Sequence, residues 1–114
     1  MASGTITKDM VLLWTNPSPT STFAPQTISL DLSKYSAVLI ACRLDNSTTP
    51  YGGNYLCFIG EITYMTLYVR PVNSIYSRYL TVSTSGITFA EGYTTATNLN
   101  NNAMVPNRIY GIKA

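Results

Sequence analysis

The feature that most constrains this chain is a repeated pattern of short runs rich in Thr, Ile, Val and Tyr, each bounded by Gly, Pro, Asn or Ser. β-Branched and aromatic residues favour strands, and turn residues at such intervals are typical of β-sandwiches and barrels. Glu, Lys, Gln and Arg, which usually cover exposed helix faces, number only ten among 114 residues. The sequence therefore predicts an all-β fold, an antiparallel, jelly-roll-like β-sandwich of about eight strands.

A single domain, residues 1–114, accounts for the whole chain. This length is ordinary for one domain and too short for two separate cores. A chain of this size buries roughly two-thirds of the surface that its unfolded form exposes. Its hydrophobic content of 46% argues against intrinsic disorder. We therefore expect a self-sufficient core without metal or disulfide staples.

The expected strands are residues 10–14, 27–33, 36–44, 55–70, 75–83, 86–93 and 108–113. Residues 55–70 are either one long bent strand or a hairpin broken at Gly60, and we favour the bent strand because a lone Gly is a weak turn signal. Residues 51–54 contain two glycines and predict a turn. Residues 98–102, nearly all Asn, predict a polar loop.

The core is predicted from alternation in the second and third runs. In 27–33 every second residue is apolar, and after a short turn one side of the next strand continues the same surface. We expect these strands to be neighbours in a meander and to face one interior with Ile28, Leu30, Leu32, Val38, Ile40 and Cys42. Because 36–44 is almost continuously apolar, we expect it to be a central strand covered on both faces, partly by a neighbouring subunit.

The polarity of the chain is mostly uncharged. Thr, Ser and Asn number 36, charged residues make up 11%, and the net charge is +2 with no histidine. Scattered basic residues do not give the positive field of a nucleic-acid binder. The N-terminal residues lack the pattern of a secretion signal, and no run approaches the roughly 20 apolar residues of a membrane helix. We therefore expect no nucleic-acid partner, no export by its own signal and no membrane insertion.

Cys42 and Cys57 lie within apolar stretches, which predicts buried, reduced thiols. A disulfide between neighbouring strands is the alternative. Glycoside hydrolysis would need two carboxylates facing each other across a cleft, for which Glu61 with Glu91 is the pair to consider. Residues 45–46 and 98–102 offer oxygen ligands for Ca²⁺, but turn formation explains them. We predict no catalytic residue, no metal site and no cofactor.

Aromatic residues provide the contact candidates. Trp14 is predicted to pack in the core or an interface, with stacking on a sugar ring as the alternative. On an alternating strand, Tyr64 and Tyr68 share one face while Met65, Leu67 and Val69 share the other. Tyr is enriched at interfaces, so this Tyr surface is predicted as a subunit interface, with ligand contact or ordinary core covering as alternatives. The interface or ligand-contact candidates are Trp14, Tyr51, Tyr55, Tyr64, Tyr68, Tyr76 and Tyr79.

Two segments and the run of strand residues between them carry a family resemblance that covers the whole chain in order. Residues 13–35 read LWTNPSPTSTFAPQTISLDLSKY, and residues 105–113, after a run of strands, read VPNRIYGIK. In this order they resemble small proteins and terminal domains of tailed bacteriophages and prophages of gut bacteria. Asn107 and Arg108 depart from the ending Ile-Pro-Tyr-Lys-Ile-Tyr-Gly-Ile-Lys that is common in that family, and Ser36 stands where an Asp is usual. The resemblance implies a virion structural protein of a tail, fibre or spike, built on a β-sandwich and often trimeric.

The leading hypothesis is therefore a non-enzymatic virion protein of the tail, fibre, spike or head decoration, made in the bacterial host cytoplasm. It would act through homo-oligomerisation, with a trimer favoured by the resemblance, and through contacts with other virion proteins. The alternative is a receptor-recognition module that attaches to host-surface glycans through Trp14, the tyrosines and the Asn-rich loop.

Overall fold

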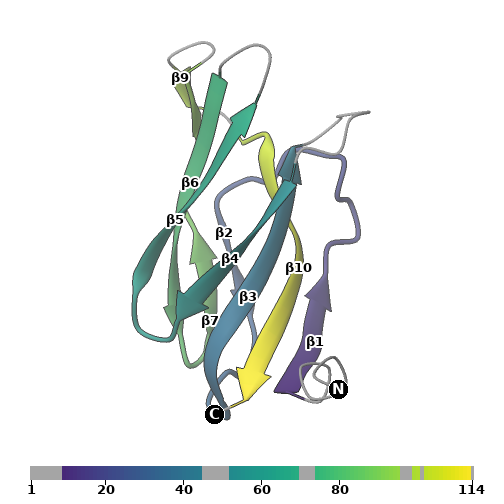
Figure 1. Ribbon diagram of the computed structural model, residues 1–114, viewed down its shortest axis with the longest axis vertical. Helices are drawn as coiled ribbons and strands as arrows, with labels where there is room; N and C mark the ends of the chain where they lie inside the picture. Colours follow the sequence, from purple (N-terminus) through teal and green to yellow (C-terminus); the bar gives the residue numbers. More distant parts are fainter. Residues whose placement is uncertain (1–8, 45–51, 70–73, 96–98, 101, 114) are drawn as a thin grey trace.

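The structure, a computed structural model, describes residues 9–44, 52–69, 74–95, 99–100 and 102–113. These residues form ten strands in two antiparallel sheets that pack face to face, with the strands of both running along the long axis of the molecule (Figure 1). The expectation of an antiparallel β-sandwich is confirmed. Two strands more than expected appear because two of the ten are only two residues long.

Sheet A has four strands in the order β1-β10-β3-β4, which are Met10–Thr15, Met104–Lys113, Tyr35–Leu44 and Gly52–Phe58. Sheet B is built around β6, Ser74–Ser83. One edge of β6 pairs with β5, and the other pairs with β7 along one part and with β8 along another. In turn, β2 pairs with β7 and β9 with β8. The bounds of these strands are Gln26–Ser29 for β2, Ile62–Val69 for β5, Gly86–Phe89 for β7, Tyr93–Thr94 for β8 and Leu99–Asn100 for β9.

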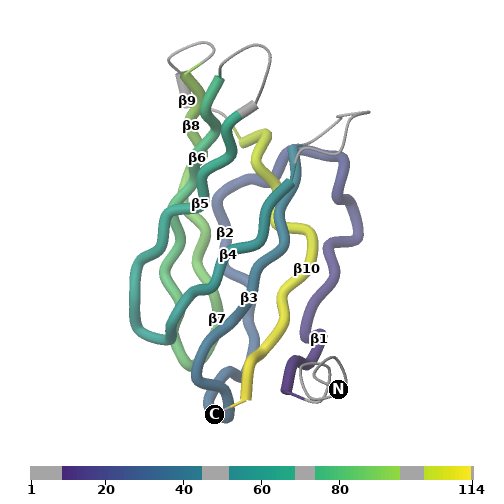
Figure 2. Tube along the Cα trace, in the orientation of Figure 1, coloured from purple at the N-terminus to yellow at the C-terminus, as the bar shows by residue number. Residues whose placement is uncertain are grey.

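Strands from the two halves of the chain are paired in both sheets, as in a jelly roll. The first strand, β1, lies beside the last, β10, and β2 lies beside β7. β10 also pairs with β3, and β6 with β8. The pairs β3 with β4, β5 with β6, β6 with β7 and β8 with β9 join strands that follow each other in sequence. The segment between β1 and β2 crosses from sheet A to sheet B at the end of the sandwich opposite the start of β1 (Figure 2).

The core lies between the sheets and contains the six residues predicted from alternation. Four of them are buried, and Ile28 and Leu30 are half-buried and pack against the others. The predicted meander is wrong, because β2 pairs with β7 in sheet B whereas β3 pairs with β10 and β4 in sheet A. A tight turn, closed by the Tyr35 N–H donating to the Leu32 carbonyl at 3.1 Å, carries the chain across the core. The two apolar sets therefore meet from opposite sheets rather than along one.

The prediction of one long bent strand at 55–70 is also wrong. The chain forms β4 in sheet A and β5 in sheet B, with a turn between them at Gly60. Gly60 has a φ of 89°, a conformation that a residue with a Cβ rarely adopts. Its N–H donates to the Val82 carbonyl at 2.6 Å, which ties the turn to β6. A single Gly is therefore enough to send the chain from one sheet to the other.

Three further boundaries differ from expectation. The predicted turn at 51–54 is wrong for Gly52 onward, which belongs to β4. Gly52 lets β4 lie very close to β3, because a Cβ at this position would be 2.7 Å from the Cys42 carbonyl oxygen. Tyr51 lies outside the described residues. In the Asn-rich segment, Leu99–Asn100 pairs with β8 instead of remaining in a loop. The last strand starts at Met104 and includes Pro106 beside a shift in register, an arrangement that tolerates the missing N–H.

Candidate functional site

The outer surface of sheet B forms the first candidate site, which we call the tyrosine face. It consists of the outward side chains of β5, β6 and β8: Ile62, Tyr64, Thr66, Tyr68, Ile75, Ser77, Tyr79, Thr81 and Tyr93. Tyr64 and Tyr68 are 66% and 54% exposed, whereas Met65 and Leu67 between them are buried. The predicted division of this strand into an aromatic and an aliphatic side is thus confirmed for these four residues.

Tyr64 and Tyr79 form an aromatic pair on the tyrosine face. They lie opposite each other in the ladder, with ring centroids 5.5 Å apart and planes tilted by 50°. The Tyr79 carbonyl accepts from the Ala90 N–H at 3.0 Å, so the backbone hydrogen bonds of Tyr79 point away from β5. Tyr64 and Tyr79 are therefore a non-hydrogen-bonded pair, the kind whose side chains approach most closely.

Hydroxyl groups extend the tyrosine face across the rest of sheet B. Thr81 lies between Ile62 of β5 and Thr88 of β7, and Thr88 lies opposite Thr27 of β2. The Thr27 and Thr88 hydroxyls are hydrogen-bonded to each other at 2.9 Å. None of the described residues in this row or on the tyrosine face is charged. The outer surface of sheet B therefore offers aromatic rings, hydroxyls and two isoleucine side chains without ions.

The outer surface of sheet A, which we call the aliphatic face, has a different chemistry. Its side chains fall in two rows that cross all four strands: Leu12, Tyr110, Leu39 and Leu56 in one, and Met10, Ile112, Ala37 and Phe58 in the other. Leu12, Leu56 and Phe58 are 51%, 49% and 53% exposed. The adjacent row carries the basic side chain of Arg108, opposite Ala41.

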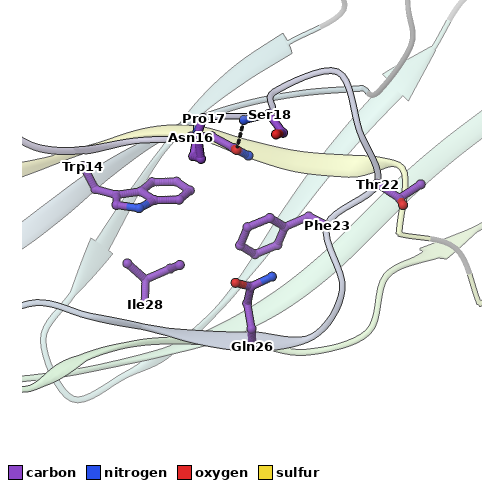
Figure 3. Close-up of a pocket in the computed structure, with 8 residues that line it drawn as sticks. All are labelled: Trp14, Asn16, Pro17, Ser18, Thr22, Phe23, Gln26 and Ile28. Atoms are coloured by element: carbon purple, nitrogen blue, oxygen red, sulfur yellow. Dashed lines mark hydrogen bonds between the residues drawn. The ribbon is translucent and has the colours of Figure 1, made fainter.

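The third candidate is a pocket of about 320 Å³ at the open edge between the sheets, where Trp14 of β1 faces Ile28 of β2 (Figure 3). The lining residues are Trp14, Asn16, Pro17, Ser18, Thr22, Phe23, Gln26 and Ile28. Trp14 is half-buried and meets Phe23 edge to face, with ring centroids 6.2 Å apart. Trp14 therefore packs against the core, which was one of the two alternatives predicted for it, and it also lines a cavity.

A buried arginine contacts Phe23, one of the residues that line the pocket. Arg78, on the inner side of β6, is only 1% exposed, and its guanidinium carbon lies 5.2 Å from the centre of the Phe23 ring. Its Nε donates to the Ala90 carbonyl at 2.7 Å and its Nη1 to the Met104 carbonyl at 3.1 Å. Burial lowers the pKa of Arg78 to about 10, partly offset by the charge of Glu91, so the side chain is still a cation at pH 7.

Two of the predicted contact residues serve the interior instead. Tyr76, on the inner side of β6, is half-buried against the core. Tyr55 of β4 is also half-buried, and its hydroxyl donates to the backbone carbonyl of Thr66 in β5. Tyr55 thus connects the neighbouring edges of the two sheets, and its burial raises the pKa of its phenol. Of the seven predicted candidates, three lie exposed on the tyrosine face, namely Tyr64, Tyr68 and Tyr79.

Three residues at these sites, Tyr93, Arg78 and Gln26, were not among the candidates predicted from the sequence. Tyr93 of β8 extends the tyrosine face beside Ser77, but its strand is only two residues long and carries no alternation. Arg78 occupies the same side of β6 as Leu80 and Val82, so its inward direction was readable from period two. Gln26 lines the pocket because the chain crosses from sheet A to sheet B just before β2, and no local sequence pattern reveals that crossing.

The groups considered for chemistry lie apart from these sites. Cys42 and Cys57 are free and buried, as predicted, and Cys57 lies opposite Val38, four residues along β3 from Cys42. Neither Glu61 nor Glu91 lines the pocket. Among the described residues, no three His, Cys, Asp or Glu side chains are grouped to hold a metal ion.

Comparison with protein-family models, with curated proteins and with solved structures found no match. Within the part of the chain that the structure describes, no helix is long and apolar enough to cross a membrane.

Proposed function

We propose that the protein is a non-enzymatic structural component of a bacteriophage particle that acts through homo-oligomerisation and contacts with other virion proteins. The observation that carries the proposal is the aliphatic face of sheet A. The phage context rests on the resemblance of residues 13–35 and 105–113 to virion proteins.

The aliphatic face is unusual for the outer side of a small antiparallel sandwich. Such sheets normally alternate between an apolar side facing the core and a polar side facing water. On β3, the inward residues Val38 and Ile40 are fully buried, while Leu39 between them faces outward and has Tyr110 and Leu56 as its cross-strand neighbours. Both sides of the central strand are therefore apolar, which favours a protein partner over the outer side.

The dimensions of the aliphatic face suit the centre of an interface. Four strands at about 4.8 Å spacing make it roughly 15 Å wide. A stable interface buries about 800 Å² on each partner, with an apolar centre and a polar rim in which Arg is common. Arg108 next to the two apolar rows supplies part of such a rim. A second copy of the chain is the partner we propose, and the trimeric state follows from the resemblance.

Sedimentation equilibrium at micromolar concentration tests the proposal. We expect a multiple of the 12.5 kDa chain mass, with a trimer as the favoured state. Leu56→Glu and Phe58→Glu place a carboxylate on an edge strand at half-exposed positions and should release monomers. Ser29→Glu is the matched control on the edge strand β2 of the opposite sheet, where the residue is exposed, and should keep the wild-type mass. A wild-type monomer, or equal dissociation by all three variants, would contradict the proposal.

A further inference from the structure

The pocket beside Trp14 has the properties of a small ligand site. Figure 3 shows the indole of Trp14 next to the ring of Phe23, which it contacts edge to face, with Asn16 and Pro17 along one wall and Gln26 and Ile28 along the other. Small-molecule sites are concave, mostly apolar and about 300–1,000 Å³ in volume. A volume of about 320 Å³ is at the lower end of that range, which fits one six-membered ring with its substituents.

The wall between the ends of β1 and β2 is held rigidly. The Asn16 side chain is nearly buried, donates from Nδ2 to the Pro106 carbonyl at 2.9 Å and accepts the Ser18 N–H on Oδ1 at 2.7 Å. The Phe23 N–H donates to the Asn102 carbonyl at 3.0 Å, which fixes the far end of the segment. Because the pocket is already formed, a ligand would not have to order these residues on binding.

The polar groups of the pocket lie at its rim and are uncharged. Ser18 and Thr22 supply hydroxyls, and Gln26 keeps its side-chain oxygen as an acceptor because its Nε2 donates to the Ala24 carbonyl at 3.0 Å. None of the described residues that line the pocket carries a charge. The cation of Arg78 contacts the Phe23 ring but does not line the cavity.

This combination corresponds to the surface of a neutral sugar ring. A pyranose presents C–H groups on its faces, which pack on an aromatic surface, and hydroxyls around its edge, which exchange hydrogen bonds with amides and hydroxyls. A purely apolar ligand would make no hydrogen bond to the rim groups, and an ionic ligand would find no counter-charge in the lining.

We propose that the pocket binds one ring of a neutral saccharide, packed against Trp14 and bonded through its hydroxyls to Gln26, Thr22 and Ser18. The site is separate from both outer faces of the sandwich. It is therefore independent of the proposed oligomerisation, and each idea can fail without the other.

Trp14 is the only tryptophan in the chain, so tryptophan fluorescence reports on this pocket directly. Titration with glucose, galactose, mannose and N-acetylglucosamine is expected to give a saturable change for at least one sugar. A single sugar ring has about a dozen heavy atoms, for which a Kd of about 1 mM is expected. N-acetylneuraminic acid, an anionic sugar, and N-acetylleucinamide, an apolar amide, serve as comparison probes.

Variants on β2 provide the matched test. Gln26→Ala removes the rim amide and should raise the Kd of the sugar that gives a saturable response about fivefold. Ser29→Ala, three residues further on the same strand and outside the pocket, should leave the titration unchanged. Both positions are exposed, so both variants should fold. The absence of a saturable response to all four neutral sugars, a stronger response to either comparison probe, or equal weakening by Gln26→Ala and Ser29→Ala would overturn the proposal.

Discussion

The outer faces of the two sheets can be compared position by position, because both belong to antiparallel strands with a buried inner side. The aliphatic face of sheet A carries Leu, Ile, Met and Phe across four strands, with Tyr110 as its one tyrosine in the two rows. The tyrosine face of sheet B carries four tyrosines, a series of Thr and Ser residues, and only two aliphatic residues, Ile62 and Ile75. An aliphatic side chain gains only from leaving water, whereas Tyr keeps a polar group that water or a partner can bond. The comparison therefore agrees with the proposed subunit contact on sheet A and leaves sheet B for reversible or hydrated contact.

The inner sides of the sheets differ as well. The inward residues of β3 are aliphatic or Cys, so sheet A contributes an apolar half to the core. Sheet B contributes Arg78 among Leu80, Val82 and Met65. The difference predicts that sheet B depends on a few directional hydrogen bonds, while sheet A depends on packing. Four measurements test this difference between the two sheets.

Arg78→Ala is expected to have the largest effect. The change removes the donors to the Ala90 and Met104 carbonyls and the cation above the Phe23 ring. Leaving buried acceptors unpaired and emptying the space of a long side chain should lower the free energy of unfolding by about 3–5 kcal/mol. Urea denaturation followed by circular dichroism measures the loss.

Arg78→Met separates the two causes. Met fills most of the same volume but donates no hydrogen bond, so it should recover the packing share and leave a deficit of about 1–3 kcal/mol for the unpaired carbonyls. Arg78 also carries a desolvated charge, and replacing such a charge by an apolar residue is sometimes neutral. A Met variant as stable as the wild type would show that sheet B, like sheet A, depends on packing alone.

The second comparison uses two neighbouring residues of β3. Ile40 points into the core and is fully buried, so Ile40→Ala should lower the free energy of unfolding by about 2–5 kcal/mol. Leu39 points to the aliphatic face, so Leu39→Ala should weaken assembly rather than the subunit. The denaturation midpoint of an oligomer rises with protein concentration. We expect Ile40→Ala to keep that rise and Leu39→Ala to lose most of it; the opposite result would place the subunit contact elsewhere.

Local alternation made much of the fold predictable. Period two identified most of the strands, the buried side of β3, and the split between Tyr64 and Met65, because each of these depends only on which side a residue points to. The burial and the reduced state of both cysteines were predictable as well, because each lies in an apolar stretch of a strand and a free cysteine behaves there as a small apolar side chain.

The pairing of strands was not predictable, because alternation does not say which sheet a strand joins. The turn before Tyr35 and the turn at Gly60 look like a hairpin and a bend in the sequence, yet each carries the chain across the core. The pocket is built on such a crossing and brings Trp14 of β1 together with Ile28 of β2. Its lining residues therefore had no common signal in the sequence.

The third measurement concerns the interior of sheet A. Burial raises the pKa of Cys42 from 9.0 to about 12. Above pH 9 the unfolded chain loses this proton while the folded chain keeps it, so the free energy of unfolding should fall as pH rises, by at most about 1.4 kcal/mol per pH unit. Cys42→Ala should unfold with a shallower pH dependence than the wild type between pH 9 and 10. Identical slopes would mean that Cys42 is not desolvated, and that the inner side of sheet A is less dry than its packing indicates.

The smallest expected effect concerns the tyrosine face itself. Tyr64 and Tyr79 are exposed cross-strand neighbours with ring centroids 5.5 Å apart, and such a pair contributes about 0.2–1 kcal/mol to stability. A double-mutant cycle of Tyr64→Ala and Tyr79→Ala, measured by urea denaturation, should give a coupling energy in that range. The same variants should sediment with the wild-type mass, because the proposed subunit contact lies on sheet A. Dissociation by either Tyr variant, together with a coupling that grows with protein concentration, would move that contact to the tyrosine face and reverse the roles of the two sheets.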